Sequence, residues 1–263
     1  MLSSEIATAL TGRRIIIELL PFSFKESLIY KYTPEETPAI DKKKELKLYM
    51  EKGGFPETYK VDVDTYQYLN NLLPATIAND VLYRYGEKIR NIEKIKILAD
   101  ILVNRCCQEI SYRKIAKIID VKSHQTVEKY VGYLLGTFLF CSLNKYSFKH
   151  SEQIRGNKKI YLVDNGFLTS KNLFFSSNIG VYFENLVFIE LFRRRIAENY
   201  DMYYYKTKNQ KEVDFYLKNS NSLNSKLIQV CYDLTEDNTN KKEVSALLEA
   251  SKELNCNELI IIN

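Results

Sequence analysis

Four polar residues in the last third of the chain have the types and spacing of a metal-dependent site. Glu184 lies in a segment whose pattern predicts a helix, and Asp214 lies in Glu-Val-Asp-Phe, a strand pattern. Gln229 and Cys231 follow in Leu-Ile-Gln-Val-Cys, which predicts a second strand. Side chains alternate along a strand, so Asp214 shares a face with Glu212 and Tyr216, and Gln229 shares a face with Cys231. Glu184 and Asp214 could then hold Mg²⁺ through carboxylate oxygens, with Gln229 as a weak neutral ligand.

The order of these residues is similar to that of PD-(D/E)XK nucleases, which carry an acid on a helix, an Asp on a strand and Glu/Gln-x-Lys on the next strand. In such a site the metal polarises the phosphodiester and lowers the pKa of a bound water. The lysine offsets the charge that develops during the reaction. Cys231 occupies the lysine position here, and a thiol cannot replace a cation. The sequence therefore favours a degenerate site that has lost its chemistry.

Two alternatives to a degenerate site remain open. Glu212 and Asp214 could simply be surface acids of a hairpin. The site could instead be active, with a lysine that reaches it from the neighbouring strand or the turn after it. The candidates for this relocated lysine are Lys206, Lys208 and Lys211.

Positive charge is concentrated in the middle of the chain. The net charge of the 263 residues is +5, but residues 81–160 contain 16 Lys/Arg and 7 Asp/Glu. This segment is therefore strongly basic, whereas the rest of the chain is slightly acidic. Such a distribution is typical of a phosphate-binding surface. A solvated lysine-rich face would give the same count.

The basic segment has the apolar periodicity of three helices, over 92–103, 112–119 and 124–135. Two strand patterns follow, over 138–143 and 158–163, joined by a long basic loop. Three helices and a β-hairpin predict a winged helix, a helix-turn-helix variant, although such a unit can also serve protein contacts. Lysines would bind phosphates and Gln125 would read base edges. The predicted nucleic-acid-binding residues are Lys122, His124, Gln125, Lys129, Lys149, Arg155, Lys158 and Lys159.

The end of the chain alternates between strand and helix patterns. A strand over 226–232, a helix over 239–254 and a strand over 258–262 form the last unit. A helical crossover between two strands predicts that they are parallel. The sequence thus predicts a mixed α/β fold.

Composition excludes several classes of protein. No apolar stretch approaches 18 residues, and the first five residues lack the basic start and apolar core of a secretory signal. Five cysteines without a C-x-x-C spacing indicate a reducing, cytoplasmic setting rather than a disulfide framework or a zinc site. Two histidines are too few for a His-rich metal site. The pattern G-x-x-x-x-G-K-[ST] is absent, so the chain cannot bind a nucleotide through a P-loop.

Short motifs in a fixed order run nearly end to end along the chain. They are Ser3-Ser-Glu-Ile-Ala-Thr-Ala-Leu-Thr-Gly-Arg13, Leu20-Pro-Phe-Ser-Phe-Lys-Glu26, Gly53-Gly-Phe-Pro-Glu57, Asp80-Val, Tyr161-Leu-Val-Asp164-Asn-Gly166, Glu184-Asn-Leu, Glu212-Val-Asp214-Phe and Ile228-Gln-Val. With these motifs the chain resembles a family of archaeal and bacterial AAA+ ATPases. In that family the ATPase core is followed by a winged helix and a PD-(D/E)XK nuclease-like domain.

The resemblance implies four parts. Residues 1–24 would be the C-terminal edge of the AAA+ core, 25–90 a helical lid or linker, 91–165 the winged helix, and 166–263 a restriction-endonuclease-like α/β domain. Members of the family carry the phosphate-binding loop before the Ser-Ser-Glu-Ile-Ala stretch, so the resemblance implies a truncated chain. ATP is expected only with that N-terminal part. Arg13 would match the family's arginine near the nucleotide phosphates.

The favoured function is DNA binding by the C-terminal portion of an AAA+ ATPase, with no ATP hydrolysis by this chain alone. We expect no cofactor in the chain, except that Mg²⁺ could bind at Asp214 and Glu184. The resemblance implies that Gln-x-Cys belongs to branches of the family whose nuclease fold has lost its chemistry. The alternatives are a divergent Mg²⁺-dependent DNA nuclease and a protein-interaction or self-association module. No membrane partner is expected.

Overall fold

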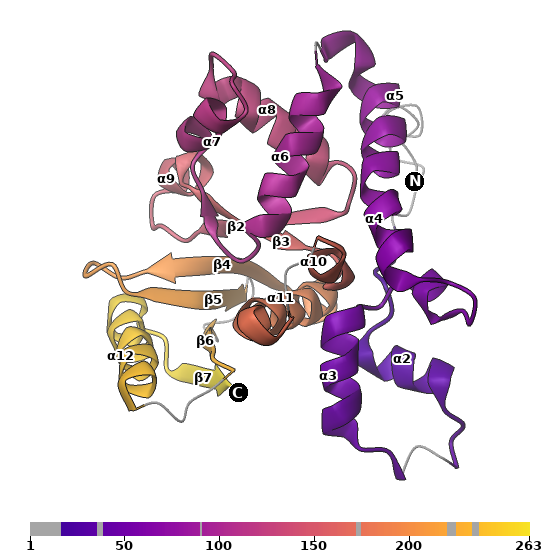
Figure 1. The fold of residues 1–263 in the computed structure, drawn as a ribbon. Coiled ribbons are helices and arrows are strands. Elements are labelled where there is room, and N and C mark those ends of the chain that lie inside the picture. The colour runs from indigo at the N-terminus through magenta and orange to yellow at the C-terminus, as the bar shows by residue number, and fades with distance from the viewer. Residues whose placement is uncertain (1–16, 36–38, 90, 172–174, 220–224, 233–236) are drawn as a thin grey trace.

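A seven-stranded mixed sheet with helices around it forms the centre of the protein, as the computed structural model shows (Figure 1). The structure describes residues 17–35, 39–89, 91–171, 175–219, 225–232 and 237–263. Arg13, and with it most of the segment predicted to be the edge of an ATPase core, lies outside the described residues. The predicted mixed α/β fold class is confirmed.

Two helices open the described part of the chain. Helix α2 (Phe24–Lys31) begins with a capping box, in which the Glu26 N–H donates to Ser23 Oγ and the Ser23 N–H donates to the Glu26 carboxylate. These reciprocal bonds satisfy backbone donors that the first helical turn leaves open. Helix α3 (Lys42–Lys52) ends at Gly53, and a 3₁₀ turn (Pro56–Tyr59) follows.

A long helical rod leads from this region to the basic segment. It consists of α4 (Thr65–Thr76), a π-helical turn (Ile77–Val81), α5 (Leu82–Tyr85) and a 3₁₀ turn (Gly86–Lys88). Pro74 lies inside α4, where it has no N–H to donate to the preceding turn. The π turn follows within one helical turn of this proline, which is a usual way for a helix to absorb a local disruption.

The basic segment contains the three helices and the antiparallel hairpin that its apolar periodicity predicts, together with the short strand β1 and the short helix α9. The elements are α6 (Ile92–Asn104), β1 (Glu109–Ile110), α7 (Tyr112–Ile118), α8 (His124–Leu135), β2 (Phe140–Lys145), α9 (His150–Arg155) and β3 (Lys158–Leu162). Strand β3 pairs antiparallel with both β1 and β2. The predicted loop between the two strands contains the short helix α9, and we call residues 145–158 the wing.

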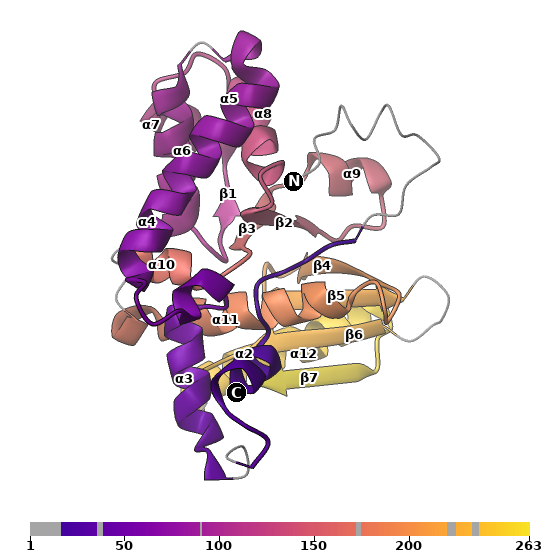
Figure 2. The same ribbon diagram turned by 90° about the vertical axis from the view of Figure 1, so that its right-hand side faces the viewer.

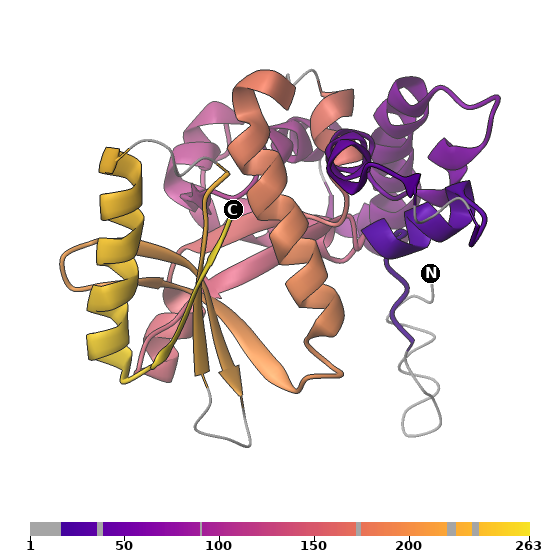
Figure 3. The same ribbon diagram turned by 90° about the horizontal axis from the view of Figure 1, so that it is seen from below.

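The remaining elements extend the same sheet. They are α10 (Gly166–Ser170), α11 (Phe175–Arg194), β4 (Tyr200–Lys206), β5 (Glu212–Asn219), β6 (Ser225–Val230), α12 (Asp237–Leu254) and β7 (Glu258–Ile262). The strand order is β1-β3-β2-β4-β5-β6-β7, and β6 and β7 are parallel as predicted. Helices α11 and α12 cover opposite faces of strands β5–β7 (Figure 3). Because β2 pairs with β4, one sheet continues across the boundary predicted between residues 165 and 166.

Two of the glycine-containing motifs meet where the end of α3 approaches the turn after β3. Gly54 N–H donates to one oxygen of Asp164 at 2.6 Å, and Gly166 N–H donates to the other at 2.8 Å. Gly53 has a φ of +81°, and a Cβ built there would lie 1.8 Å from Asp164 Oδ1. Only glycine fits this close approach and this backbone conformation. The contact joins the N-terminal helices to the turn after β3, and Figure 2 shows α3 and α4 alongside the core.

No helix among the described residues is long and apolar enough to cross a membrane.

Candidate functional site

Lys159 of β3 lies at the centre of a cluster of carboxylates. Its Nζ is 2.7 Å from Glu212 Oε1, 3.2 Å from Glu184 Oε1 and 3.4 Å from Asp214 Oδ1. The residue is only 2% exposed. A lysine this deeply buried must be paired, because an isolated ammonium group in a protein interior is very unfavourable. We call Lys159, Glu184, Glu212 and Asp214 the carboxylate–lysine cluster.

Helix α11 contributes Glu184 and fixes its position through the next residue. Tyr161 OH donates to Glu184 Oε1 at 2.8 Å. Asn185 is fully buried, accepts from the Leu162 N–H at 2.9 Å and donates to the Leu162 carbonyl at 3.1 Å. The Asn185 amide therefore pairs with β3 as a strand backbone would. Because α11 is anchored to β3 next to Tyr161, Glu184 faces Lys159.

A β-bulge places Asp214. Tyr203 pairs with Tyr216 and Tyr205 pairs with Val213, so two residues of β5 lie opposite one residue of β4. The extra residue reverses the alternation of side chains along β5, and Phe215 packs in the core under α11 whereas Tyr216 packs toward α12. The sequence-based alternation, which placed Tyr216 on the face of Glu212 and Asp214, is therefore wrong beyond Asp214. Bulges commonly redirect side chains beside functional sites.

Gln229 contacts Asp214 through the backbone and turns toward the other face of the sheet. Its Oε1 accepts from the Asp214 N–H at 3.3 Å, and its Nε2 donates to Glu243 Oε2 of α12 at 2.6 Å. Asp214 Oδ2 accepts from the Val230 N–H at 3.0 Å. These bonds replace the strand pairing that stops at Phe215 and Ile228. Cys231 follows β6, and its N–H donates to the Ile262 carbonyl of β7.

Burial dominates the electrostatics of the cluster. Burial, followed by the neighbouring Asp214 carboxylate, raises the pKa of Glu184 to about 7, although Lys159 and the Tyr161 hydroxyl oppose this rise. Burial also raises the pKa of Asp214, against the effect of Lys159. For Lys159, burial alone would lower the pKa, but the three carboxylates raise it well above its ordinary value. The lysine is therefore charged at neutral pH, whereas Glu184 is partly protonated.

Stability should fall as the pH rises from 6 to 8. Burial raises the pKa of Asp164 to about 7, as it does for Glu184. A carboxyl group with a raised folded-state pKa binds its proton more tightly in the folded chain, so its contribution is fully present at low pH and is lost as the pH rises through 7. Each group should contribute about 1 kcal/mol to the loss over this interval. Urea unfolding at pH 6 and pH 8 measures it, and Glu184→Gln should remove about half of the difference. A chain equally stable at both values would contradict this assignment.

The carboxylates predicted as Mg²⁺ ligands, those of Glu184 and Asp214, are paired with a lysine in this structure. Oxygens of both residues and of Glu212 point at the Lys159 ammonium group, which occupies the position where a shared cation would lie. Among the described residues, no group of three or more His, Cys, Asp or Glu side chains is arranged to hold a metal ion. The Lys159 ammonium group neutralises these carboxylates instead.

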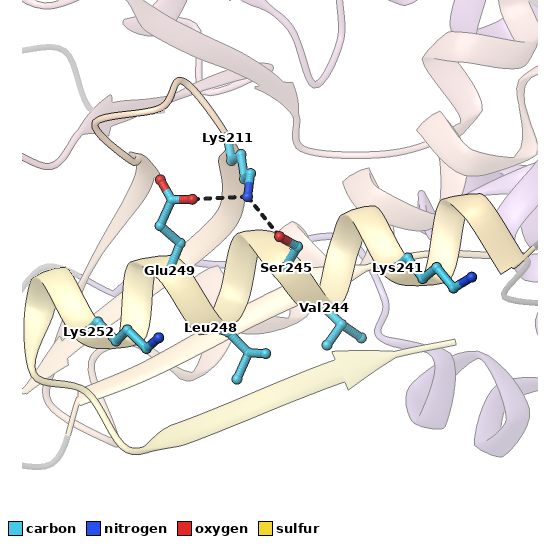
Figure 4. A pocket seen from close by; sticks show the side chains of 7 residues that line it. All are labelled: Lys211, Lys241, Val244, Ser245, Leu248, Glu249 and Lys252. Carbon is cyan, nitrogen blue, oxygen red and sulfur yellow. Dashed lines mark hydrogen bonds and ion pairs between the residues drawn. The ribbon is translucent and has the colours of Figure 1, made fainter.

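The three lysines considered as replacements for Cys231 differ in their distance from the cluster. Lys206 borders the cluster, with its Nζ 3.3 Å from Glu212 Oε2 and 2.5 Å from Glu109 Oε1. The Lys208 backbone N–H donates to Glu253 of α12. Lys211 also lies at α12, where its Nζ contacts Glu249 at 3.0 Å and Ser245 at 2.7 Å (Figure 4). Of these three, only Lys206 is linked to the cluster, through Glu212.

Figure 4 also shows a surface pocket on α12, lined by Lys211, Lys241, Val244, Ser245, Leu248, Glu249 and Lys252. Helical periodicity predicts that Leu248 faces the sheet, but the residue is half exposed in this pocket. Among the α12 residues whose side chains the structure describes, those that are buried are Ala246, Leu247 and Ala250.

Exposed basic residues lie on α7, on α8 and on the wing, and we call them together the basic surface. Helix α7 packs against α8 (Figures 1 and 2). Lys158 is half-buried, and Lys159 is absent from this surface because it belongs to the cluster. Helix α7 adds exposed basic residues to those that the sequence predicts to bind nucleic acid. The predicted binding residues that are exposed are Lys122, His124, Gln125, Lys129, Lys149 and Arg155, and α7 adds Arg113, Lys114 and Lys117.

The sequence predicts Lys159 as a nucleic-acid-binding residue and does not assign Tyr161 to the site. One signal was available: Lys159 directly precedes an apolar strand pattern, Ile-Tyr-Leu-Val, and a lysine in a buried strand requires acidic partners. The partner acids come from α11 and β5, and no sequence pattern shows that β3 lies beside them.

Two family models match the chain. "Domain of unknown function (DUF8612)" matches residues 43–177, just over half of the chain, and "Domain of unknown function (DUF4143)" matches residues 179–263. The chain therefore belongs to the DUF8612 family, with a DUF4143 region following it. The two matches meet beside Asn178, where α11 has a non-helical residue.

Two curated relatives match most of the chain. An "Uncharacterized protein MJ1544" of Methanocaldococcus jannaschii is 37% identical over 265 residues, covering 97% of the chain. An "Uncharacterized protein" of Haemophilus influenzae is 30% identical over 245 residues, covering 90% of the chain. The chain spans 58% of the length of each relative. No solved structure matches the chain.

Proposed function

We propose that this chain is the DNA-binding C-terminal portion of an AAA+ ATPase, and that α8 and the wing make the contact. The observation that carries the proposal is the set of exposed basic residues on α7, α8 and the wing. The resemblance in motifs supports the ATPase assignment. The greater length of the two relatives leaves room in them for an ATPase core.

The start of α8 suits contact with DNA. Its N-cap, Ser123, accepts from the Gln125 N–H at 3.2 Å, and its hydroxyl donates to Gln125 Oε1 at 2.9 Å. His124, Gln125 and Lys129 are exposed along the helix. The N-terminal residues of a recognition helix are those that reach base edges, and the positive end of the helix dipole favours nearby phosphates. Gln125 would read a base edge, while Lys122 and Lys129 would bind phosphates.

DNA binding should depend steeply on salt. If four phosphates are contacted, affinity should fall on the order of 100-fold between about 50 and 200 mM salt, because bound counterions are released. The double variant Lys122→Ala/Lys129→Ala should reduce the salt slope by about 2. The matched control is Lys42→Ala/Lys43→Ala on α3, at the opposite end of the molecule from α8 (Figure 1), which removes the same charge. Fluorescence anisotropy of a labelled duplex measures both, and equal slopes for the two double variants would contradict the proposal.

The carboxylate–lysine cluster then has a structural role. It links β3 of the basic part to α11 and β5 of the C-terminal part, and Lys206 extends the ion pairs to Glu109 of β1. The ion pairs of the cluster would thereby hold the DNA-binding part against the nuclease-like part.

A divergent nuclease remains the second candidate, since Lys159 brings to the acids a cation that Cys231 cannot supply. The two candidates differ in one assay. Cleavage of DNA that requires Mg²⁺ and disappears in a folded Asp214→Asn variant would support the nuclease. DNA that is bound but stays intact with Mg²⁺ or Mn²⁺ supports the structural role.

A further inference from the structure

One aromatic side chain of the wing projects into solvent from a cluster of tyrosines. Phe148 is 75% exposed. Its ring meets the Tyr146 ring edge-on, with centroids 5.5 Å apart. Tyr146 is itself buried against Tyr203 and Tyr216, at 5.4 Å and 4.8 Å. The Phe148 ring is therefore fixed on one side by its contact with Tyr146 and exposes most of its surface to solvent.

The wing that carries this ring is rich in basic residues. The wing, residues 145–158, contains Lys145, Lys149, Arg155 and Lys158 but only one acid, Glu152. Glu152 is already paired with Lys149 at 3.3 Å and accepts from Ser147 Oγ at 2.7 Å. From β5, Lys218 lies over the Tyr146 ring, with its Nζ 5.5 Å from the centroid. Positive charge near the Tyr146–Phe148 pair thus comes from the wing and from Lys218 of β5, whose cross-strand partner is Asp201 of β4.

Exposed aromatic surface among cations matches one class of partner. A nucleobase offers a flat π face, and the phosphates on either side of it offer negative charge. In a paired duplex the faces of the bases are stacked on one another and are not accessible, so the partner of Phe148 must be an unpaired base. A hydrophobic protein segment would gain nothing from the surrounding positive charge.

We propose that Phe148 stacks on an unpaired base, so that the wing binds single-stranded DNA beside the duplex that α8 contacts. This inference rests on the proposed function and specifies its substrate as DNA with a single-stranded segment. The wing lysines would follow the backbone of the single strand, and α8 would keep its contact with the paired part.

The test compares two labelled probes, a blunt duplex and the same duplex with a single-stranded tail. Phe148→Ala should weaken binding of the tailed probe by about 5- to 150-fold, the range expected for one stacked base. Binding of the blunt duplex should stay within about twofold. Phe148→Leu keeps an apolar side chain without a π face and should behave as Phe148→Ala, whereas Phe148→Tyr should bind as the unaltered chain does. The matched control is Ile154→Ala, because Ile154 of α9 is another exposed apolar side chain of the wing, at 61% exposure.

Each outcome decides the proposal. Unchanged binding of the tailed probe by Phe148→Ala, full binding by Phe148→Leu, or an equal loss on both probes would overturn it while leaving the proposed function in place. Failure of the unaltered chain to bind either probe would overturn both. Because Phe148 is mostly exposed, its replacement should not unfold the chain, and thermal unfolding of each variant verifies this.

Discussion

Replacing Lys159 by methionine should lower the free energy of unfolding by about 3–5 kcal/mol at pH 7, the cost of leaving buried charges without their partner. Methionine keeps most of the apolar stem, so the loss reports mainly on the ammonium group. Glu184, Glu212 and Asp214 would then face one another without a cation between them. Urea unfolding followed by circular dichroism measures the loss.

The pH dependence of this loss separates charge from packing. Without the ammonium group, repulsion and burial raise the pKa of Glu184 and Asp214 further, so the carboxylates protonate more readily. Protonation removes the repulsion, and the variant should therefore lose less stability at pH 5 than at pH 7. The control is Lys158→Met, at the half-buried neighbour in β3 whose side chain alternates to the other face. Equal losses of stability by the two variants at both pH values would show that the ion pairs of Lys159 do not contribute to stability.

Gly53→Ala should destabilise the chain by about 3 kcal/mol or more, or prevent folding, because it adds both a steric clash and backbone strain. The new Cβ would lie 1.8 Å from Asp164 Oδ1 and 2.8 Å from the Gly166 nitrogen. Relief of this overlap would require α3 to move away from the turn after β3. The φ of +81° adds a further cost for any residue with a Cβ.

Gly132→Ala is the matched control. Gly132 lies within α8, and a Cβ there would meet no other atom within 4 Å. Alanine favours a helix interior over glycine, so this variant should be as stable as the unaltered chain or up to about 1 kcal/mol more stable. Thermal unfolding compares the two. A Gly53→Ala chain that unfolds together with the unaltered chain would show that α3 does not dock tightly.

Local patterns predict the elements of this fold well. The capping box at Ser23 and the parallel pairing of β6 with β7 both follow from spacing alone. The longer helices and strands after residue 91 form where their apolar periodicity places them, whereas β1, α9 and α10 have no such signal. Each of these features depends on residues that are close in the chain or on a single crossover, and that information is local.

The assembly of the candidate site depends on contacts that are distant in the chain. Lys159 and Asp214 are far apart in sequence, and only the pairing of β2 with β4 brings their strands into one sheet. The bulge in β5 is a second non-local feature, since it depends on how β4 and β5 pair. Alternation along β5 therefore predicts the positions of Glu212 and Asp214 but not that of Tyr216.

The pairing of Asp164 with Gly54 is also a contact between residues that are distant in the chain. The motifs that contain these residues are conspicuous in the sequence, but neither indicates that the other is its partner. A carboxylate with two backbone donors and a glycine that admits it form one structural unit only in the folded chain.

The most direct test of the DNA-binding proposal is a titration of labelled DNA, bearing a single-stranded tail, with the unaltered chain in the presence of Mg²⁺. Anisotropy is recorded between about 50 and 200 mM salt, and the recovered DNA is then examined on a denaturing gel. We predict salt-dependent binding and DNA of unchanged length. An affinity that does not change with salt, or the absence of binding, would contradict the role of the basic surface, and DNA shortened only by chains with an intact Asp214 would contradict the structural role of the carboxylate–lysine cluster.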